Sequence, residues 1–234
     1  DTDAVRAVAT GPDGFLSKAV NKSALWVDCS TVDVATSQAM GRAAAQAGWQ
    51  FIDAPVAGSR EPAAAGELVF LAGGDANDLA QAQPLLDVMG KKPIHAGSIV
   101  AGSALKMTIN LMLGQSLAAY SEAVALGTAL GLDPALTQNV LLNTPVAAPV
   151  LGALRSRLES DDRTPHFPLL HMHKDLRLAV DSAAAGGLPL NVTAATRDLF
   201  ARAVETANAQ GEVADFSAAF RVLNPESGGN SSDG

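Results

Sequence analysis

Residues 1–97 alternate between strand-like and helix-like patterns of apolar and polar positions, whereas the pattern is helical to the end after residue 132. Between these parts, residues 98–132 favour helix throughout and contain no proline. A helix of about 30 residues runs roughly 45 Å, which exceeds the width of a small domain. Such a helix either spans a membrane or crosses between two packed bodies.

Polar residues within this stretch decide between the two possibilities. Lys106, Asn110, Gln115, Ser121 and Glu122 recur along it, whereas a membrane span needs about 18 or more apolar residues in succession. A charged side chain near the middle of a bilayer is also costly. We therefore expect a buried interdomain helix and no membrane partner.

The first part of the chain reads as an α/β domain. Its predicted helices are 3–9, 15–20, 34–47 and 76–89, and its predicted strands are 24–29, 51–56, 66–72 and 94–97. Strands that alternate with helices indicate an open, largely parallel sheet. Ligands of such sheets bind at the carboxyl ends of the strands.

Small polar residues follow two of the predicted strands. Ser30 and Thr31 come after the first strand, and Ala57, Gly58 and Ser59 come after the second. Ser-Thr in this position is also typical of the N-cap of the next helix. The pattern leaves both roles open, and one residue can fill both.

The second part of the chain is expected to be all-helical. Its predicted helices are 134–142, 150–159, 171–185, 191–210 and 215–222, with a polar loop at 160–168. The Ser/Gly-rich tail 224–234 is expected to be disordered. The predicted organisation is thus an α/β domain at 1–97, an interdomain helix with an all-α domain at 98–223, and a tail at 224–234.

Composition and charge exclude several classes of partner. The formal net charge is −8 and no run of Lys or Arg occurs, so nucleic acid and anionic membranes are not expected partners. The single cysteine, Cys29, excludes an internal disulfide and fits a reducing, cytoplasmic location. The chain begins DTDAVRAV, without Met or a signal peptide, and we expect it to be a fragment or a processed product.

Lys106 and Asn110 are four residues apart and therefore share one face of the long helix. In one interpretation Lys106 lays its stem on the core and extends its ammonium to solvent. In the other, Lys106 is an acid and Asn110 is the amide that orients it. The residues alone do not decide between the two.

The other candidate motifs have plain structural interpretations. His166, His171 and His173 lack a completing set of Asp, Glu or Cys at ligand spacing, so no metal is predicted. Lys174 and Asp175 read as a solvated charge pair. No P-loop, G-x-G-x-x-G or G-x-S-x-G motif is present in the sequence.

Several stretches together resemble the β-hydroxyacid dehydrogenase family, which includes 3-hydroxyisobutyrate and 6-phosphogluconate dehydrogenases. DAPVAGS at 53–59 resembles its substrate loop, GSALKMTIN at 102–110 its catalytic helix, and KDLRLA at 174–179 its cofactor-side motif. STVD at 30–33, PAAAGELVFLAGGD at 62–75 and DFSA at 215–218 are most similar to its glyoxylate and succinic semialdehyde reductase branch. The resemblance runs in order along residues 1–223.

The resemblance implies the remnant of a Rossmann-type parallel sheet domain, joined by the interdomain helix to a helical domain. The glycine fingerprint of that domain is absent, together with roughly 60 residues, about two βαβ-sized units. The implied reaction is reduction of a short aldehyde acid, glyoxylate or succinic semialdehyde, with NADP as cofactor and NAD possible. The family also implies a homodimer or homotetramer.

The resemblance assigns a role to each matching residue. Lys106 donates the proton, Asn110 orients the substrate or the lysine, and the loop Ala57, Gly58 and Ser59 holds the substrate carboxylate. Ser30, Thr31, Phe167, Lys174 and Asp175 lie on the cofactor side. The family serine of the substrate loop is Ala57 here, a loss of about 1 kcal/mol or more toward a charged group, which Ser59 can compensate.

Two alternatives to this function stay open. One is an NAD(P)-dependent dehydrogenase of the 3-hydroxyisobutyrate type that runs in the oxidative direction, because the same residues serve both directions. The other is a catalytically inactive, dehydrogenase-like module for oligomerisation. Retention of both Lys106 and Asn110 favours an enzyme.

Overall fold

The computed structural model describes residues 1–18, 23–159 and 164–225, and all structural statements below concern these residues. The chain forms two compact units, Asp1–Ile109 and Asn110–Gly234, which we call the sheet unit and the helical unit. The division falls inside helix α5 (Ala101–Ala129), which contributes residues to both units.

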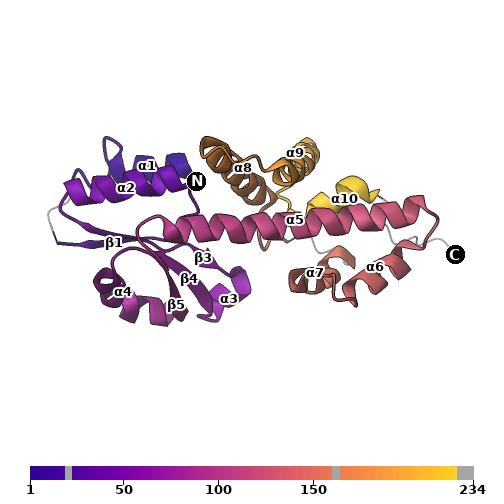
Figure 1. The fold of residues 1–234 in the computed structure, drawn as a ribbon, viewed down its shortest axis with the longest axis horizontal. Helices are drawn as coiled ribbons and strands as arrows, with labels where there is room; N and C mark the ends of the chain where they lie inside the picture. The colour runs from indigo at the N-terminus through magenta and orange to yellow at the C-terminus, as the bar shows by residue number, and fades with distance from the viewer. Residues whose placement is uncertain (19–22, 160–163, 226–234) are drawn as a thin grey trace. The chain divides into compact units, whose positions relative to one another are not determined.

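Helix α5 confirms the predicted long helix, with somewhat shorter ends. It has 29 residues, which corresponds to about 43 Å, and it is drawn as one uninterrupted helix in Figure 1. Among the described helices, none combines the length and the apolar character that a membrane crossing requires.

Within the described residues, the sheet unit contains five strands and four helices ahead of α5. The sheet has the order β1-β2-β4-β3, with β5 paired to β4. Its strands are β1 (Leu25–Asp28), β2 (Gln50–Asp53), β3 (Val56–Ala57), β4 (Leu68–Gly73) and β5 (Gly90–Gly97), and its helices are α1 (Thr2–Thr10), α2 (Val34–Gln46), α3 (Arg60–Ala64) and α4 (Ala76–Met89).

The sheet is mixed rather than largely parallel, which corrects the prediction. β1 pairs with β2 and β4 pairs with β5 in parallel, and each pair is joined by a full helix, α2 or α4. β4 runs antiparallel to both β2 and β3. Parallel pairing needs a long crossover, and the chain from β2 to β4 offers only β3 and the five-residue α3.

Alternation along β2 explains why helices cover both faces of the sheet. Phe51 packs with Ala9 of α1 and Met40 of α2, whereas the next residue, Ile52, packs with Leu86 of α4. Successive side chains of a strand point to opposite faces. Figure 1 accordingly shows α1 and α2 on one face of the sheet and α4 on the other.

The helical unit is built from the second part of α5 and the helices that follow it. They enclose one apolar core that includes Leu117, Met172, Leu176, Phe200 and Phe220. The elements are α6 (Pro134–Leu142), α7 (Pro149–Glu159), α8 (Leu169–Ala185), α9 (Asn191–Gln210), the short 3₁₀ helix η1 (Phe216–Ala218) and α10 (Ala219–Leu223). The predicted class, α/β followed by all-α, is therefore confirmed.

Three local predictions need correction. The predicted strand 51–56 is interrupted at Ala54 and Pro55, and β3 is a separate strand. The predicted helix 15–20 is a turn over residues 15–18, and its last residues lie outside the described part of the chain. Asn224, placed in the disordered tail, is buried and donates from Nδ2 to the Ser121 carbonyl at 3.0 Å; residues 226–234 lie outside the described residues.

Candidate functional site

The carboxyl ends of β1 and β2 lie side by side in the sheet unit. Asp28 is paired with Asp53, and the N–H of Ala54 donates to the Asp28 carbonyl at 2.7 Å. Ser30 and Thr31 follow β1 at this edge, where ligands of α/β sheets bind. The parallel pairing predicted from the sequence therefore holds for these two strands.

Neither Ser30 nor Thr31 caps the next helix. The N-cap of α2 is Asp33, whose Oδ1 accepts the Thr36 N–H at 2.8 Å. The Ser30 N–H instead donates to Asp28 Oδ1 at 3.1 Å, which bends the loop back on the end of its own strand. Of the two roles that the sequence left open, the capping role is thus taken by another residue.

The predicted substrate loop follows β3, which lies beyond β4 in the sheet, rather than β2. Ala57 pairs with Val69 inside the sheet, whereas Gly58 and Ser59 are exposed. Gly58 has φ +119°, and a Cβ there would lie 3.1 Å from both the Leu68 and Pro62 side chains. Glycine is therefore required at 58, where the backbone turns out of the sheet.

A buried carboxylate holds the first turn of α5, a feature the sequence reasoning missed. Asp53, 1% exposed, accepts the Val100 N–H at Oδ1 (2.8 Å) and the Ser103 N–H at Oδ2 (2.6 Å). Burial raises the pKa of the Asp53 carboxyl, and the bonds from Ser103 and Val100 offset only part of that effect. The sequence signal for this anchor is an acidic residue at the end of a strand, the first residue of the motif DAPVAGS.

Lys106 and Asn110 lie on α5 at the predicted spacing of four residues. Lys106 is half-buried and belongs to the sheet unit, and Asn110 is 2% exposed and belongs to the helical unit. An almost fully buried amide must satisfy its hydrogen bonds internally. The partner of Asn110 therefore matters for any role of this pair.

Asn110 is held by a charged pair on α8. Its Nδ2 donates to Asp175 Oδ2 at 2.6 Å, and Lys174 Nζ contacts Asp175 Oδ1 at 2.8 Å. A carboxylate only accepts hydrogen bonds, so it fixes which end of the Asn110 amide faces it. Asp175 and Lys174 have side chains 2% and 15% exposed, so the prediction of a solvated charge pair is wrong.

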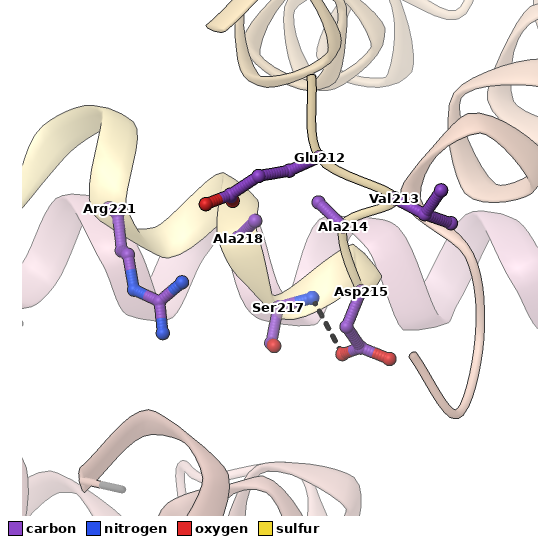
Figure 2. Close-up of a pocket in the computed structure, with 7 residues that line it drawn as sticks. All are labelled: Glu212, Val213, Ala214, Asp215, Ser217, Ala218 and Arg221. Atoms are coloured by element: carbon purple, nitrogen blue, oxygen red, sulfur yellow. Dashed lines mark hydrogen bonds between the residues drawn. The ribbon is translucent and has the colours of Figure 1, made fainter. Parts of the chain in front are cut away.

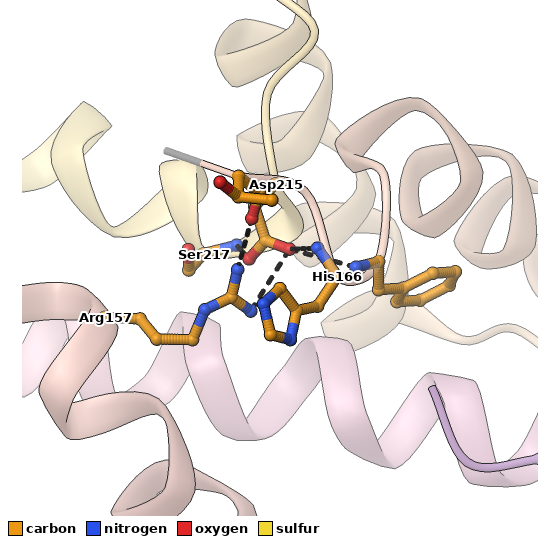
Figure 3. A network of polar contacts seen from close by, with 6 residues as sticks. Arg157, His166, Asp215 and Ser217 are labelled. Carbon is orange, nitrogen blue, oxygen red and sulfur yellow. Dashed lines mark hydrogen bonds and ion pairs between the residues drawn. The ribbon is translucent and has the colours of Figure 1, made fainter. Parts of the chain in front are cut away.

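Phe167, predicted to lie on the cofactor side, is fixed by Asp215 of the motif DFSA. Asp215 Oδ2 accepts the N–H groups of His166 and Phe167 at 2.9 and 3.0 Å, and Arg157 Nη1 lies 3.3 Å from the same oxygen. Figure 3 shows Arg157, His166 and Ser217 gathered around this carboxylate. Asp215 is thus a structural anchor for the segment that carries Phe167.

The histidines form no metal site in the described part of the chain, where no group of three His, Cys, Asp or Glu could hold an ion. His166 uses its backbone N–H for Asp215. Burial, followed by the positive charges of Arg177 and Arg197, lowers the pKa of His173. These surroundings disfavour the charged form of His173.

Two cavities of the helical unit lie apart from the predicted residues. One, of about 240 Å³, lies over η1 and α10, and Figure 2 shows Glu212, Ser217 and Arg221 along its wall. The other, of about 420 Å³, is a largely apolar groove over α5 and the segment that joins α6 to α7. Neither is lined by a residue that the resemblance assigns to substrate or cofactor.

Comparison with known proteins supports the two-unit organisation. Residues 1–102 match the family described as the NAD binding domain of 6-phosphogluconate dehydrogenase. Residues 100–223 match the family described as NAD-binding of NADP-dependent 3-hydroxyisobutyrate dehydrogenase. The two matches meet at the start of α5.

Individual relatives agree with these families. Glyoxylate/succinic semialdehyde reductase 2, chloroplastic, of Arabidopsis thaliana is 32% identical over 86% of this chain and 56% of its own length. The 3-hydroxyisobutyrate dehydrogenase of Pseudomonas aeruginosa is 36% identical over 91% of this chain and 73% of its own length. The solved 3-hydroxyisobutyrate dehydrogenase of Mycobacterium tuberculosis, with L-serine, is 32% identical, with a TM-score of 0.77 over 95% of this chain and 76% of that one.

An NAD-binding α/β unit followed by a helical unit defines the class of nicotinamide-dependent dehydrogenases with two domains. Within that class, the chain belongs to the β-hydroxyacid dehydrogenase family, as the resemblance implied. The chain spans little more than half of the first of these relatives.

Proposed function

We propose that the full-length protein reduces a short aldehyde acid, glyoxylate or succinic semialdehyde, to the hydroxy acid with NADPH, and that Lys106 donates the proton. The family and the reductase among the relatives support this reaction class. The observation that carries the proposal is the buried hydrogen bond between Asn110 and Asp175. Asn110 lies on α5, four residues after Lys106. Such a buried polar pair fixes a side chain more tightly than a solvated one.

The residues at the edge of β1 fit a dinucleotide. The hydroxyls of Ser30 and Thr31 are groups of the kind that bind amide, ribose and phosphate oxygens, whereas the Ser30 N–H donates to Asp28 Oδ1. On the α8 side we assign Phe167, Lys174 and Asp175 to the cofactor, with Asp175 acting through the Lys174 ammonium that it pairs with. The cofactor would supply a hydride to the aldehyde carbon, with NADP preferred and NAD possible.

Lys106 is assigned the role of general acid. As the aldehyde carbon is reduced, negative charge develops on its oxygen, and the Lys106 ammonium donates a proton to that oxygen. Asn110 donates its Nδ2 hydrogen to Asp175, so its carbonyl Oδ1 points to the other side of the amide. That oxygen is the acceptor with which Asn110 orients the ammonium or the substrate.

The loop at the end of β3 is assigned to the substrate carboxylate. Gly58 and Ser59 are exposed, and we assign their backbone N–H groups to the carboxylate. Ala57 carries no hydroxyl, so recognition rests on these N–H groups and on the Ser59 hydroxyl. A site of this kind selects a carboxylate group, whereas the chain length of the acid is selected by other contacts.

The remaining assignments concern organisation. We assign residues 1–97 to a dinucleotide-binding domain, and residues 98–223 to the interdomain helix and the all-helical domain. We also propose that the protein is cytoplasmic. We also propose a homodimer or homotetramer, because Met112 and Val146, 61% and 81% exposed, line the apolar groove of the helical unit. Light scattering of a monomeric mass would contradict this assembly.

The test measures NADPH oxidation by the full-length protein with glyoxylate and with succinic semialdehyde, and NAD(P)⁺ reduction with 3-hydroxyisobutyrate. Lys106→Ala should lower kcat by about 10²–10⁴-fold, the usual contribution of general acid catalysis, and should still bind NADPH. Lys91→Ala is the matched control, since that lysine is 63% exposed on β5 and pairs only loosely with Glu67 at 3.5 Å.

Each outcome has a definite meaning. Undiminished turnover by Lys106→Ala would remove the lysine from the mechanism. Turnover only with 3-hydroxyisobutyrate would replace the reductase by the oxidative dehydrogenase. Absence of turnover with all three compounds, in a protein that oligomerises, would favour the inactive module.

A further inference from the structure

The start of α5 is capped from outside its own sequence neighbourhood. The residue before the helix is Val100, whose side chain has no polar atom and supplies no N-cap. The first N–H groups of a helix lack partners within the helix. Here Asp53, some fifty residues earlier and at the end of β2, accepts two of them, from Val100 and Ser103.

The backbone at Val100 is in a strained conformation, and its N–H is one of the two groups that Asp53 holds. Val100 has φ +81°, a left-handed conformation that a β-branched residue rarely adopts. Such a conformation persists only where the surroundings impose it, and it is concentrated at functional sites. The 2.8 Å bond from the Val100 N–H to Asp53 Oδ1 is one such constraint.

Two glycines bring the helix directly onto the sheet. A Cβ at Gly102 would lie 2.1 Å from the Leu71 carbonyl oxygen and 2.7 Å from that of Asp53. A Cβ at Gly73 would lie 2.5 Å from Asp53 Oδ1. The two glycines therefore place no side chain of their own between the first turn of α5 and the strand ends, and the Asp53 carboxylate lies against that turn.

Lys106 lies one turn beyond this anchor. Ser103 and Lys106 are three residues apart and share a helix face. A rigid helix transmits any shift of its first turn to the residue one turn further on. The bonds that fix Ser103 therefore also fix the position of the Lys106 backbone relative to β2.

We propose that Asp53 is a positioning residue, whose buried carboxylate locks the first turn of α5 onto the sheet and thereby sets the position of Lys106. This inference rests on the proposed function, because it concerns the residue assigned as the acid. Although Asp53 belongs to the substrate-loop motif, its role is to hold the first turn of α5 and involves no contact with the substrate.

The experiment compares Asp53→Asn with Asp75→Asn in the full-length protein. Asparagine keeps one acceptor oxygen but places an NH₂ group against a backbone N–H, so one bond is lost at Asp53. Asp75 caps α4 by accepting the Asn77 N–H at 2.8 Å, and α4 carries no residue of the proposed site. Both variants are assayed at a temperature at which circular dichroism shows them to be folded.

For Asp53→Asn we expect kcat to fall roughly 10- to 100-fold, as for a catalytic group displaced by about 1 Å, with KM within threefold of wild type. Asp75→Asn should keep kcat within twofold. Adding Val100→Gly to Asp53→Asn should recover part of kcat, because glycine adopts the positive φ without help from the carboxylate. Wild-type kcat in a folded Asp53→Asn protein would overturn the proposal, as would an equal loss in Asp75→Asn.

A measurement on the wild type keeps the test independent of variant folding. The amides of Val100 and Ser103 should exchange with deuterium as slowly as those in the middle of α5, although the first amides of a helix usually exchange fast. Fast exchange at both would overturn the anchor. Failure of wild-type turnover, or full activity of Lys106→Ala, would instead refute the proposed function and leave the exchange result standing.

Discussion

Replacing Asp215 by alanine should destabilise the helical unit more than any exposed cap does. The carboxylate is 5% exposed and accepts N–H groups from His166, Phe167 and Ser217 at 2.9–3.1 Å, with Arg157 Nη1 at 3.3 Å. Each hydrogen bond to a charged group contributes about 1.5–3 kcal/mol. Because the freed donors can in part recover water, we expect a loss of about 3–5 kcal/mol, the usual cost of breaking a buried ion pair.

Urea unfolding measures this loss unit by unit. Ellipticity at 222 nm follows mainly the helical unit, whereas the two tryptophans, Trp26 and Trp49, lie in the sheet unit and report on it. The matched control is Asp133→Ala, which removes an exposed cap of α6 and should cost about 1 kcal/mol. A loss below about 1 kcal/mol for Asp215→Ala would refute the reasoning that this carboxylate holds its loop.

Three further predictions follow from single residues. Gly102→Ala should cost about 3 kcal/mol in urea unfolding, because its Cβ meets a β4 carbonyl oxygen at 2.1 Å, whereas Gly152→Ala, with open space around it, should stabilise α7 by up to about 1 kcal/mol; equal effects would contradict the close approach. Although exposed, the Cys29 thiol has its pKa raised to about 11 by partial burial and then by the charge of Asp28, so iodoacetamide at pH 8 should label it roughly 100-fold more slowly than a free cysteine, and Asp28→Asn should speed the reaction. Burial raises the pKa of Asp53, so ionising this group costs stability. The free energy of unfolding of wild type relative to that of Asp53→Asn should therefore be highest below the ordinary pKa of about 3.9 and should fall as the pH rises through the raised pKa; a constant difference would contradict the raised pKa.

The longer elements were predictable because their patterns are local. Helix α4 has the predicted bounds 76–89, where Asp75 caps its start and Gly90 follows its end. The long helix α5 follows from the absence of helix breakers in residues 98–132. For α4 the residues that decide the structure lie within the element or next to it, whereas the first turn of α5 is also held by the distant Asp53.

The direction of β4 was not predictable in the same way. The chain between β2 and β4 holds Pro55, which lacks an N–H, and the short helix α3, neither of which has a periodic signal. Without a full crossover helix the strand returns antiparallel. The direction of β4 thus depends on the absence of a crossover helix between β2 and β4. The residues of the strands themselves do not indicate that absence.

The candidate site shows the same limit for side chains. The spacing of Lys106 and Asn110 follows from helix geometry, but the Asn110 partner, Asp175, is 65 residues away. Lys174 and Asp175 read as a solvated pair because charged neighbours on a helix usually are; in the structure the carboxylate is buried against Asn110. Burial of a charge depends on tertiary packing, which no local pattern records.

The three buried aspartates of the motifs share one physical role. Asp53 holds the first turn of α5, Asp175 holds the amide of Asn110, and Asp215 holds the backbone of Phe167. In each case a carboxylate accepts hydrogen bonds from a segment at least 47 residues away in the chain. A motif residue can therefore be essential to the geometry of a site without touching a ligand, and a motif match alone does not separate the two roles. Asparagine variants separate them, since a residue that only positions others should be rescued by a second change that restores the segment it holds.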